Sequence, residues 1–209
     1  MKGVLLTEEA QERPGSRDWL RSPVWPILFI AALAALIISS ALGRPLINLG
    51  SSKPGKAYKN YTAASDDGFS LQYPRDWRVL SREELAKFQG VFAFAAQSKK
   101  PTALFSVKVQ NIKTKAVNLG QVGRALDKAM PKNFPRFKKL GQQLTTVNGR
   151  QALDYEYTFV SNEGLAVKER LTVIPAGDKV FHLTSWASVK NFSRVKPDFD
   201  RIVAGFTVQ

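Results

Sequence analysis

The sequence predicts an α+β fold in which a single N-terminal transmembrane helix precedes an antiparallel sheet covered by helices. Three observations support this prediction. Ser22–Gly43 is an uncharged and mostly apolar run. Later segments alternate apolar and polar residues, the period of half-buried strands, and short turns join them as hairpins. Two further segments repeat apolar residues every three or four positions, as amphipathic helices do.

The run Ser22–Gly43 has the length of a membrane span, since roughly 20 apolar residues cross a bilayer core of about 30 Å. We expect a retained anchor, because the preceding residues 1–21 are long for a signal peptide and include acidic side chains. Two alternatives stay open: a signal peptide cleaved after Ala41, and a buried or peripheral helix. Basic residues flanking the run are nearly balanced. The short tail before one span favours a cytoplasmic N-terminus and an extracytoplasmic domain in the periplasm, at the cell exterior or in a thylakoid lumen.

Four regions follow from this organisation. Residues 1–21 form a polar tail, 22–43 the transmembrane helix, 44–65 a basic tether rich in proline, glycine and serine, and 66–209 one folded domain. The chain contains no cysteine, which excludes disulfides and thiol chemistry. The whole net charge of +14 lies after the apolar run, so the domain favours acidic partners.

The first half of the domain contains predicted strands and one short helix. Residues 69–73 alternate apolar and polar side chains, and Pro74 ends this strand. Ser81 and Glu84 have the spacing of a capping box, which predicts a helix to about residue 88. Two strands are then expected over Val91–Ala96 and Thr102–Ile112, the second with one polar face and one apolar face.

The second half begins with a predicted helix from about Asn118 to Met130, which Pro131 is expected to end. Asn148 and Gly149 give the strongest hairpin signal, because both tolerate positive φ. A closing helix is expected over residues 190–204, followed by a short strand at 206–208. The four strands between the two helices are expected over Leu140–Val147, Arg150–Val160, Leu165–Pro175 and Lys179–Ala187.

The opening of the domain, DDGFSLQYPRDWRV (Asp66–Val79), resembles the start of the photosystem II PsbP family and its PsbP-like relatives. Tyr155–Phe159, Val180–Ser188 and Ile202–Val208 are also similar to that family. The resemblance covers Asp66–Gln209 and implies a Mog1/PsbP-like α/β/α sandwich. It further implies a non-catalytic accessory or assembly role on photosystem II, although the family's proposed metal-binding His and Asp positions have no match in this chain.

The residues indicate no catalytic, cofactor or metal site, and we expect a protein that is not an enzyme. His182 is the only histidine, whereas metal sites need several converging ligands. The sequence contains neither a nucleophile elbow nor a glycine-rich phosphate loop. Acidic residues at 66, 67, 198 and 200 could hold a cation weakly, but capping or solubility explains them more simply. No cofactor is therefore expected.

One cluster of basic residues stands out as a candidate partner-docking site. It lies on and after the helix predicted over residues 118–130 and is interleaved with Phe134 and Phe137. A solvated charged face is the alternative explanation. Expected partners are the membrane itself, the acidic surface of a membrane protein complex and anionic lipid headgroups; nucleic acid is not expected, because no recognition motif occurs. The cluster consists of Arg124, Lys128, Lys132, Arg136, Lys138 and Lys139.

These features predict a membrane-anchored, PsbP-like accessory, scaffold or assembly subunit that docks on a larger membrane complex, of which a photosystem is one example. The alternative is an envelope binding module that captures an acidic ligand or polymer on the domain surface. An enzyme is the third and least favoured class.

Overall fold

The computed structural model describes residues 56–86, 92–113 and 116–209. Its centre is a seven-stranded sheet with the order β3-β4-β5-β9-β8-β7-β6, in which neighbouring strands are antiparallel. Its strands are β3 (Arg78–Val79), β4 (Phe94–Lys99), β5 (Thr102–Asn111), β6 (Lys138–Val147), β7 (Arg150–Val160), β8 (Ala166–Ala176) and β9 (Lys179–Ser188).

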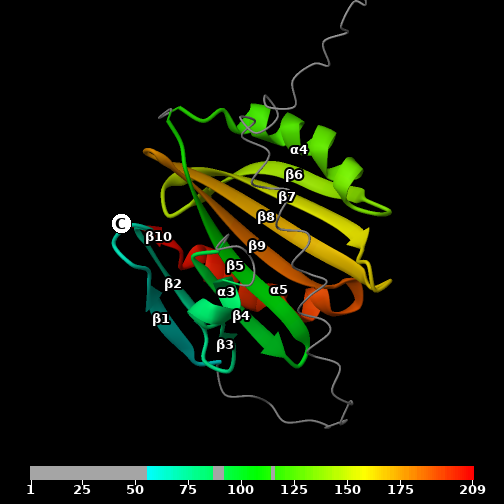
Figure 1. Ribbon diagram of the computed structural model, residues 1–209, viewed down its shortest axis with the longest axis horizontal. Helices are drawn as coiled ribbons and strands as arrows, with labels where there is room; N and C mark the ends of the chain where they lie inside the picture. Colours follow the sequence, from blue (N-terminus) through cyan, green and yellow to red (C-terminus); the bar gives the residue numbers. More distant parts are fainter. Residues whose placement is uncertain (1–55, 87–91, 114–115) are drawn as a thin grey trace, which may run out of the picture.

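A second, three-stranded sheet has the order β1-β2-β10, so the first and last strands of the described chain both pair with β2. It is formed by β1 (Tyr58–Thr62), β2 (Phe69–Pro74) and β10 (Thr207–Val208). The helices are α3 (Arg82–Ala86), α4 (Leu119–Asn133) and α5 (Val189–Ala204). Helix α4 lies on one face of the large sheet, and α5 with the small sheet lies on the other (Figure 1).

Two apolar cores result from this layering, because alternate residues of a strand point to opposite faces. On the α4 side, Leu126 and Met130 of the helix pack with Leu153 and Tyr157 of β7. On the α5 side, aromatic rings join three layers of structure: Phe69 of β2 stacks on Phe206 at 5.4 Å, and Phe181 of β9 meets Phe206 edge-on at 5.4 Å. Trp77, which contacts Phe199 of α5 at 5.7 Å, is buried as a core residue.

The predicted capping box and hairpin are confirmed. The backbone N–H of Glu84 donates to Ser81 Oγ at 3.2 Å, and the N–H of Ser81 donates to Glu84 Oε2 at 2.8 Å. At the β6–β7 turn, Asn148 and Gly149 have φ values of 45° and 78°, as a two-residue hairpin of this type needs. Asn148 Nδ2 also donates to the carbonyls of Phe206 at 2.6 Å and Ala204 at 3.1 Å, which ties the hairpin to the end of α5.

Pro131 does not end α4, contrary to the prediction. The helix continues to Asn133, where the N–H of Phe134 donates to the Met130 carbonyl at 3.1 Å and caps the last turn. A proline this close to the end removes one hydrogen bond, and the buried Phe134 ring holds the turn against the sheet. A second proline, Pro197, lies near the middle of α5.

The sheet arrangement also differs from the single sheet expected, and folded structure begins before residue 66. Residues 58–62, assigned to the tether, form β1 and pair with β2. Tyr61 explains the difference, because its ring lies 4.5 Å from Phe94 and joins the small sheet to the core. Tyr58 adds a hydrogen bond from its hydroxyl to Asp198 at 2.9 Å. The rest of the assigned tether, residues 44–55, lies outside the described residues.

The predicted tail (1–21) and transmembrane helix (22–43) also lie outside the described residues. Within residues 56–86, 92–113 and 116–209, no helix has the length and apolar character needed to cross a bilayer.

The Asn148 side chain is predicted to stabilise the domain through its two carbonyl contacts. Asn148→Gly keeps the backbone conformation but loses both hydrogen bonds, which should lower the unfolding free energy by about 1–2 kcal/mol. Asn148→Ala should cost about 1 kcal/mol more, because alanine resists positive φ. Urea unfolding of both variants measures this, and equal stability of Asn148→Gly and the parent protein would contradict it.

Candidate functional site

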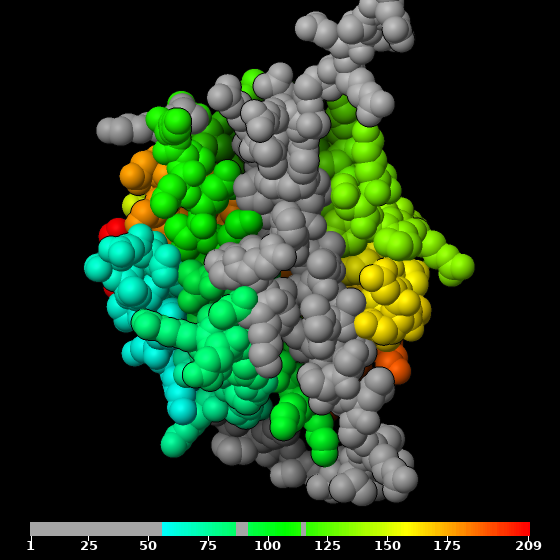
Figure 2. Space-filling model, viewed as in Figure 1, coloured from blue at the N-terminus to red at the C-terminus, as the bar shows by residue number. Residues whose placement is uncertain are grey.

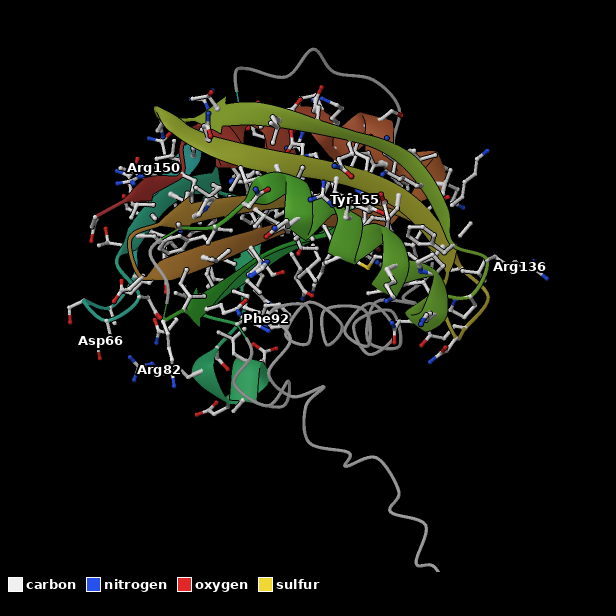
Figure 3. The ribbon with its side chains drawn as sticks, turned by 90° about the horizontal axis from the view of Figure 1, so that it is seen from above. Asp66, Arg82, Phe92, Arg136, Arg150 and Tyr155 are labelled. Atoms are coloured by element: carbon white, nitrogen blue, oxygen red, sulfur yellow. The ribbon has the colours of Figure 1, made fainter. Side chains whose placement is uncertain are left out.

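The structure places all six residues of the predicted basic cluster on the surface. Arg124, Lys128 and Lys132 recur every four residues along α4, whose last turn leads into β6. Arg136 has a left-handed backbone, with φ at 53°, and points outward from the tip of the connecting turn (Figure 3). The yellow-green segment that contains this turn projects from the side of the molecule in Figure 2. The cluster therefore extends along α4 to the projecting turn at Arg136 and the start of β6.

Lys139 differs from the other five residues, because it pairs within the domain. Its Nζ lies 2.6 Å from Asp127 Oδ1 and 2.9 Å from Gln142 Oε1, and 5.0 Å from the centre of the Tyr155 ring. Burial acts to raise the pKa of Asp127, but hydrogen bonds from Lys139 and Tyr155 together with the Lys139 charge outweigh it, so that the pKa is lowered. Lys139 thus fastens β6 to α4.

None of the other five residues forms an ion pair with another described residue. Their charges are available to a partner, and Asp127, the acidic residue among them, is already neutralised by Lys139. We define the basic patch as these five residues: Arg124, Lys128, Lys132, Arg136 and Lys138.

Sequence reasoning missed a second group, a row of titratable side chains on the α4 side of the large sheet. Lys108 of β5 lies opposite His182 of β9, and Tyr157 of β7 lies opposite Glu169 of β8. All four are buried. Both the polar and the apolar face predicted for β5 are largely buried, and strand alternation alone does not reveal that both faces of a sheet are covered.

His182 and Lys108 are both shifted toward their neutral forms. His182 Nε2 lies 3.0 Å from Gln110 Oε1. Burial, and secondly the charge of Lys108, lower the pKa of His182 to about 3. Burial also lowers the pKa of Lys108 to about 8. His182 is therefore a neutral, structural side chain at physiological pH.

Glu169 is also held in its neutral form. The Tyr157 hydroxyl donates a hydrogen bond to Glu169 Oε1. Burial raises the pKa of Glu169 to about 8 despite this hydrogen bond, which acts in the opposite direction. Burial, followed by the Glu169 charge, raises the pKa of Tyr157. The pair is a neutral hydrogen-bonded unit inside the core at pH 7.

The geometry does not assemble this row into a catalytic site. His182 bonds to an amide, and Glu169 bonds to the Tyr157 phenol. Glu169 lies four residues along β8 from Val173, the residue opposite His182. Nucleophilic catalysis requires a hydroxyl within hydrogen-bond reach of the base. Across the described ranges, no three His, Cys, Asp or Glu side chains are grouped so as to hold a metal ion.

A hollow of about 300 Å³ lies on the opposite, α5 side of the sheet. Its charged residues already pair with each other or with neighbours: Arg170 Nη1 lies 2.6 Å from Asp200, and Thr172 donates to Asp154 at 2.5 Å. Asp198, one of the acidic residues that could hold a cation weakly, instead forms an ion pair with Lys56 at 2.5 Å. The hollow is lined by Thr145, Thr146, Val147, Asn148, Asp154, Arg170, Asp200, Val203 and Ala204.

The buried row predicts a minimum in the unfolding free energy near pH 8. Glu169 keeps its proton in the folded protein up to about pH 8 but loses it near pH 4.5 when unfolded, so stability falls as the pH rises across this window. His182 and Lys108 bind fewer protons when folded, so they increase stability as the pH rises, from about 3 to 6.5 and from about 8 to 10.5 respectively. Glu169 therefore dominates between pH 6.5 and 8.

Urea unfolding between pH 6.5 and 8 should show stability falling by up to about 1.4 kcal/mol per pH unit. Glu169→Gln should remove this fall, because glutamine stays neutral. The matched control is Glu83→Gln, which neutralises an exposed glutamate of α3 and should leave the fall unchanged. An undiminished fall in Glu169→Gln would refute the assignment.

Comparison with known proteins identifies the family. The PsbP family model matches residues 56–208. No curated protein sequence is significantly similar to the chain. Cyanobacterial PsbP (CyanoP) from Synechocystis sp. PCC 6803 is structurally similar, with a TM-score of 0.56 and 15% identity, covering 79% of this chain and 100% of CyanoP.

Two further solved structures share the fold. LpqN of Mycobacterium tuberculosis, described as involved in cell envelope biogenesis, has a TM-score of 0.51 and 18% identity, covering 73% of this chain and 91% of LpqN. PA94 of Pseudomonas aeruginosa is a protein of unknown function described as a putative regulator. It has a TM-score of 0.50 and 16% identity, covering 73% of this chain and 97% of PA94. The predicted PsbP-like fold is confirmed, and the chain belongs to the PsbP family.

Proposed function

We propose that this protein is a non-catalytic accessory or assembly subunit, anchored in a membrane by residues 22–43, which docks its basic patch on an acidic surface of a membrane protein complex. One observation carries the proposal. Five exposed basic side chains extend from the second turn of α4 through the projecting Arg136 turn to the start of β6, and none forms an ion pair with another described residue. A protruding patch of one sign steers and orients a partner of the opposite sign.

Membership of the PsbP family supports this role and suggests one complex to test as the partner. Because the chain belongs to the PsbP family and is structurally similar to cyanobacterial PsbP, a photosystem is a suitable partner to test. An antiparallel sheet covered on both faces gives the patch a rigid support. Anionic lipid headgroups are a second source of negative charge near the proposed anchor.

The second candidate function is an envelope binding module. The hollow on the α5 side, with Arg170 and Asn148 among its lining residues, is the observation that favours it. The similarity to LpqN agrees with an envelope role. Neutralising the basic patch distinguishes the two functions. It should weaken docking of an accessory subunit, but it should not affect ligand binding in the hollow, which the patch residues do not line.

The anchor is predicted to be retained in the mature protein. Intact mass measurement of the protein purified from its own membranes should find residues 22–43 present, and alkaline washing should leave the protein in the membrane, since a spanning helix is not released by removing charge contacts. A mature chain that begins at Leu42 would show instead that the apolar run is a cleaved signal peptide.

Reversing the charge of the basic patch is predicted to weaken docking without unfolding the domain. We expect the triple variant to recover about tenfold less of the partner complex from solubilised membranes, which corresponds to a loss of about 1.4 kcal/mol of binding free energy. Its substitutions are Lys132→Glu, Arg136→Glu and Lys138→Glu. Lys139 is left in place, because its removal would leave Asp127 without its ion pair.

The matched control is Lys113→Glu, Lys190→Glu, Arg194→Glu, which changes the net charge equally at exposed positions outside the patch. We expect near-normal recovery with this control and similar thermal unfolding midpoints for all three proteins. Equal recovery by the two triple variants would contradict patch-specific docking. Vesicles with and without anionic lipid test the headgroup contribution separately.

A further inference from the structure

The outermost strand of the large sheet, β6, has one free edge. Its neighbour is β7, and no other described strand pairs with it. Eight of its ten residues are exposed. The backbone N–H and C=O groups that point away from β7 are therefore available to a further strand, as at other uncovered sheet edges.

The two halves of this edge differ. Near its start, β6 carries Lys138, Lys139 and a bulge between Lys139 and Gly141, and both charge and irregularity discourage strand addition. From Gln142 to Val147 the register with β7 is continuous, and the residues include no charge and no proline. We call Gln142–Val147 the open edge.

The open edge also displays an apolar side chain. The Leu144 side chain is 66% exposed, whereas Leu140 and Val189, the other exposed large apolar residues of the described chain, are less exposed. It lies opposite Leu153, a fully buried residue of the α4-side core. A strand added beside β6 would cover Leu144 and extend this core by one layer.

Charge decides which occupant fits. A second copy paired antiparallel would place Lys138 and Lys139 of one chain near Arg150 of the other, which brings like charges together in a protein of net charge +14. Figure 3 shows Arg136 and Arg150 at opposite ends of the domain, so both ends of β6 are flanked by basic residues. An acidic segment meets favourable charge at either end.

We propose that the open edge accepts an extended segment of a partner protein, apolar where it passes Leu144 and acidic where it leaves β6 beside the basic patch. This inference rests on the proposed docking function and adds the backbone pairing that fixes the register of the partner. Main-chain hydrogen bonds supply affinity in strand addition, and the flanking charges select the sequence.

Two substitutions on β6 separate strand addition from attraction by charge. Leu144→Lys places a charge within the open edge and raises the positive charge of the surface, so it should weaken an added strand yet favour a purely electrostatic partner. Leu140→Lys is the matched control, because it makes the same change at the bulge, where strand addition is already discouraged. Both side chains are exposed, so similar thermal midpoints are expected.

The probe is a synthetic peptide of alternating threonine and valine followed by glutamates, and its control is the same peptide with alternate amides N-methylated. With the full-length protein in detergent, we expect the first peptide to slow hydrogen exchange at residues 142–147. Leu144→Lys and N-methylation should each weaken binding about tenfold, whereas Leu140→Lys should not.

Equal binding of both peptides, equal binding to both variants, or unchanged exchange at residues 142–147 would overturn strand addition. The triple charge reversal of the basic patch distinguishes the two proposals. If that variant loses the membrane complex while Leu144→Lys keeps it, docking stands and strand addition fails. If Leu144→Lys alone loses the complex, strand addition stands and docking through the basic patch fails.

Discussion

Most of this structure depends on one constraint: both faces of the large sheet are covered by other elements. Helix α4 occupies one side, and α5 with the small sheet occupies the other. Every central strand must therefore supply two buried faces. This requirement explains why β8 and β9 contain long buried runs. It also explains how polar side chains such as Lys108, Glu169 and His182 come to be buried. Glu169 and His182 are neutral near pH 7, and the pKa of Lys108 is lowered to about 8.

The sequence was sufficient for features with a strong local signal. The Ser81 and Glu84 capping box, the Asn148 and Gly149 turn and the apolar periodicity of α4 and α5 all predicted real elements. Elements held by distant contacts were missed. Strand β1 has only Tyr58 and Tyr61 as partly buried anchors, and both act through residues far along the chain. Strand β3 is two residues long and carries no periodicity, whereas the short strand expected at 206–208 forms as β10 (Thr207–Val208).

The candidate site was partly predictable for the same reason. A high density of basic residues between 124 and 139 is visible without a structure. The pairing of Lys139 with Asp127 joins two elements, β6 and α4, and becomes visible only when they pack. Likewise, the exposure of Leu144 follows from the position of β6 at the edge of the sheet, which the order of strands along the chain does not specify.

The attachment of β1 gives the domain a mechanical property. Under the proposed anchoring, any tension from the membrane enters at Lys56, which binds Asp198 at 2.5 Å, and at Tyr58, whose ring lies 4.1 Å below the Arg201 guanidinium. Strand β1 pairs with β2 alone, so its release would remove the Tyr61 contact with Phe94 but break no strand pairing within the large sheet. Releasing residues 56–62 would lengthen the reach of the domain by roughly 20 Å, at about 3.3 Å per extended residue. The small sheet would then act as an extensible link that lets a docked domain follow the movements of its partner.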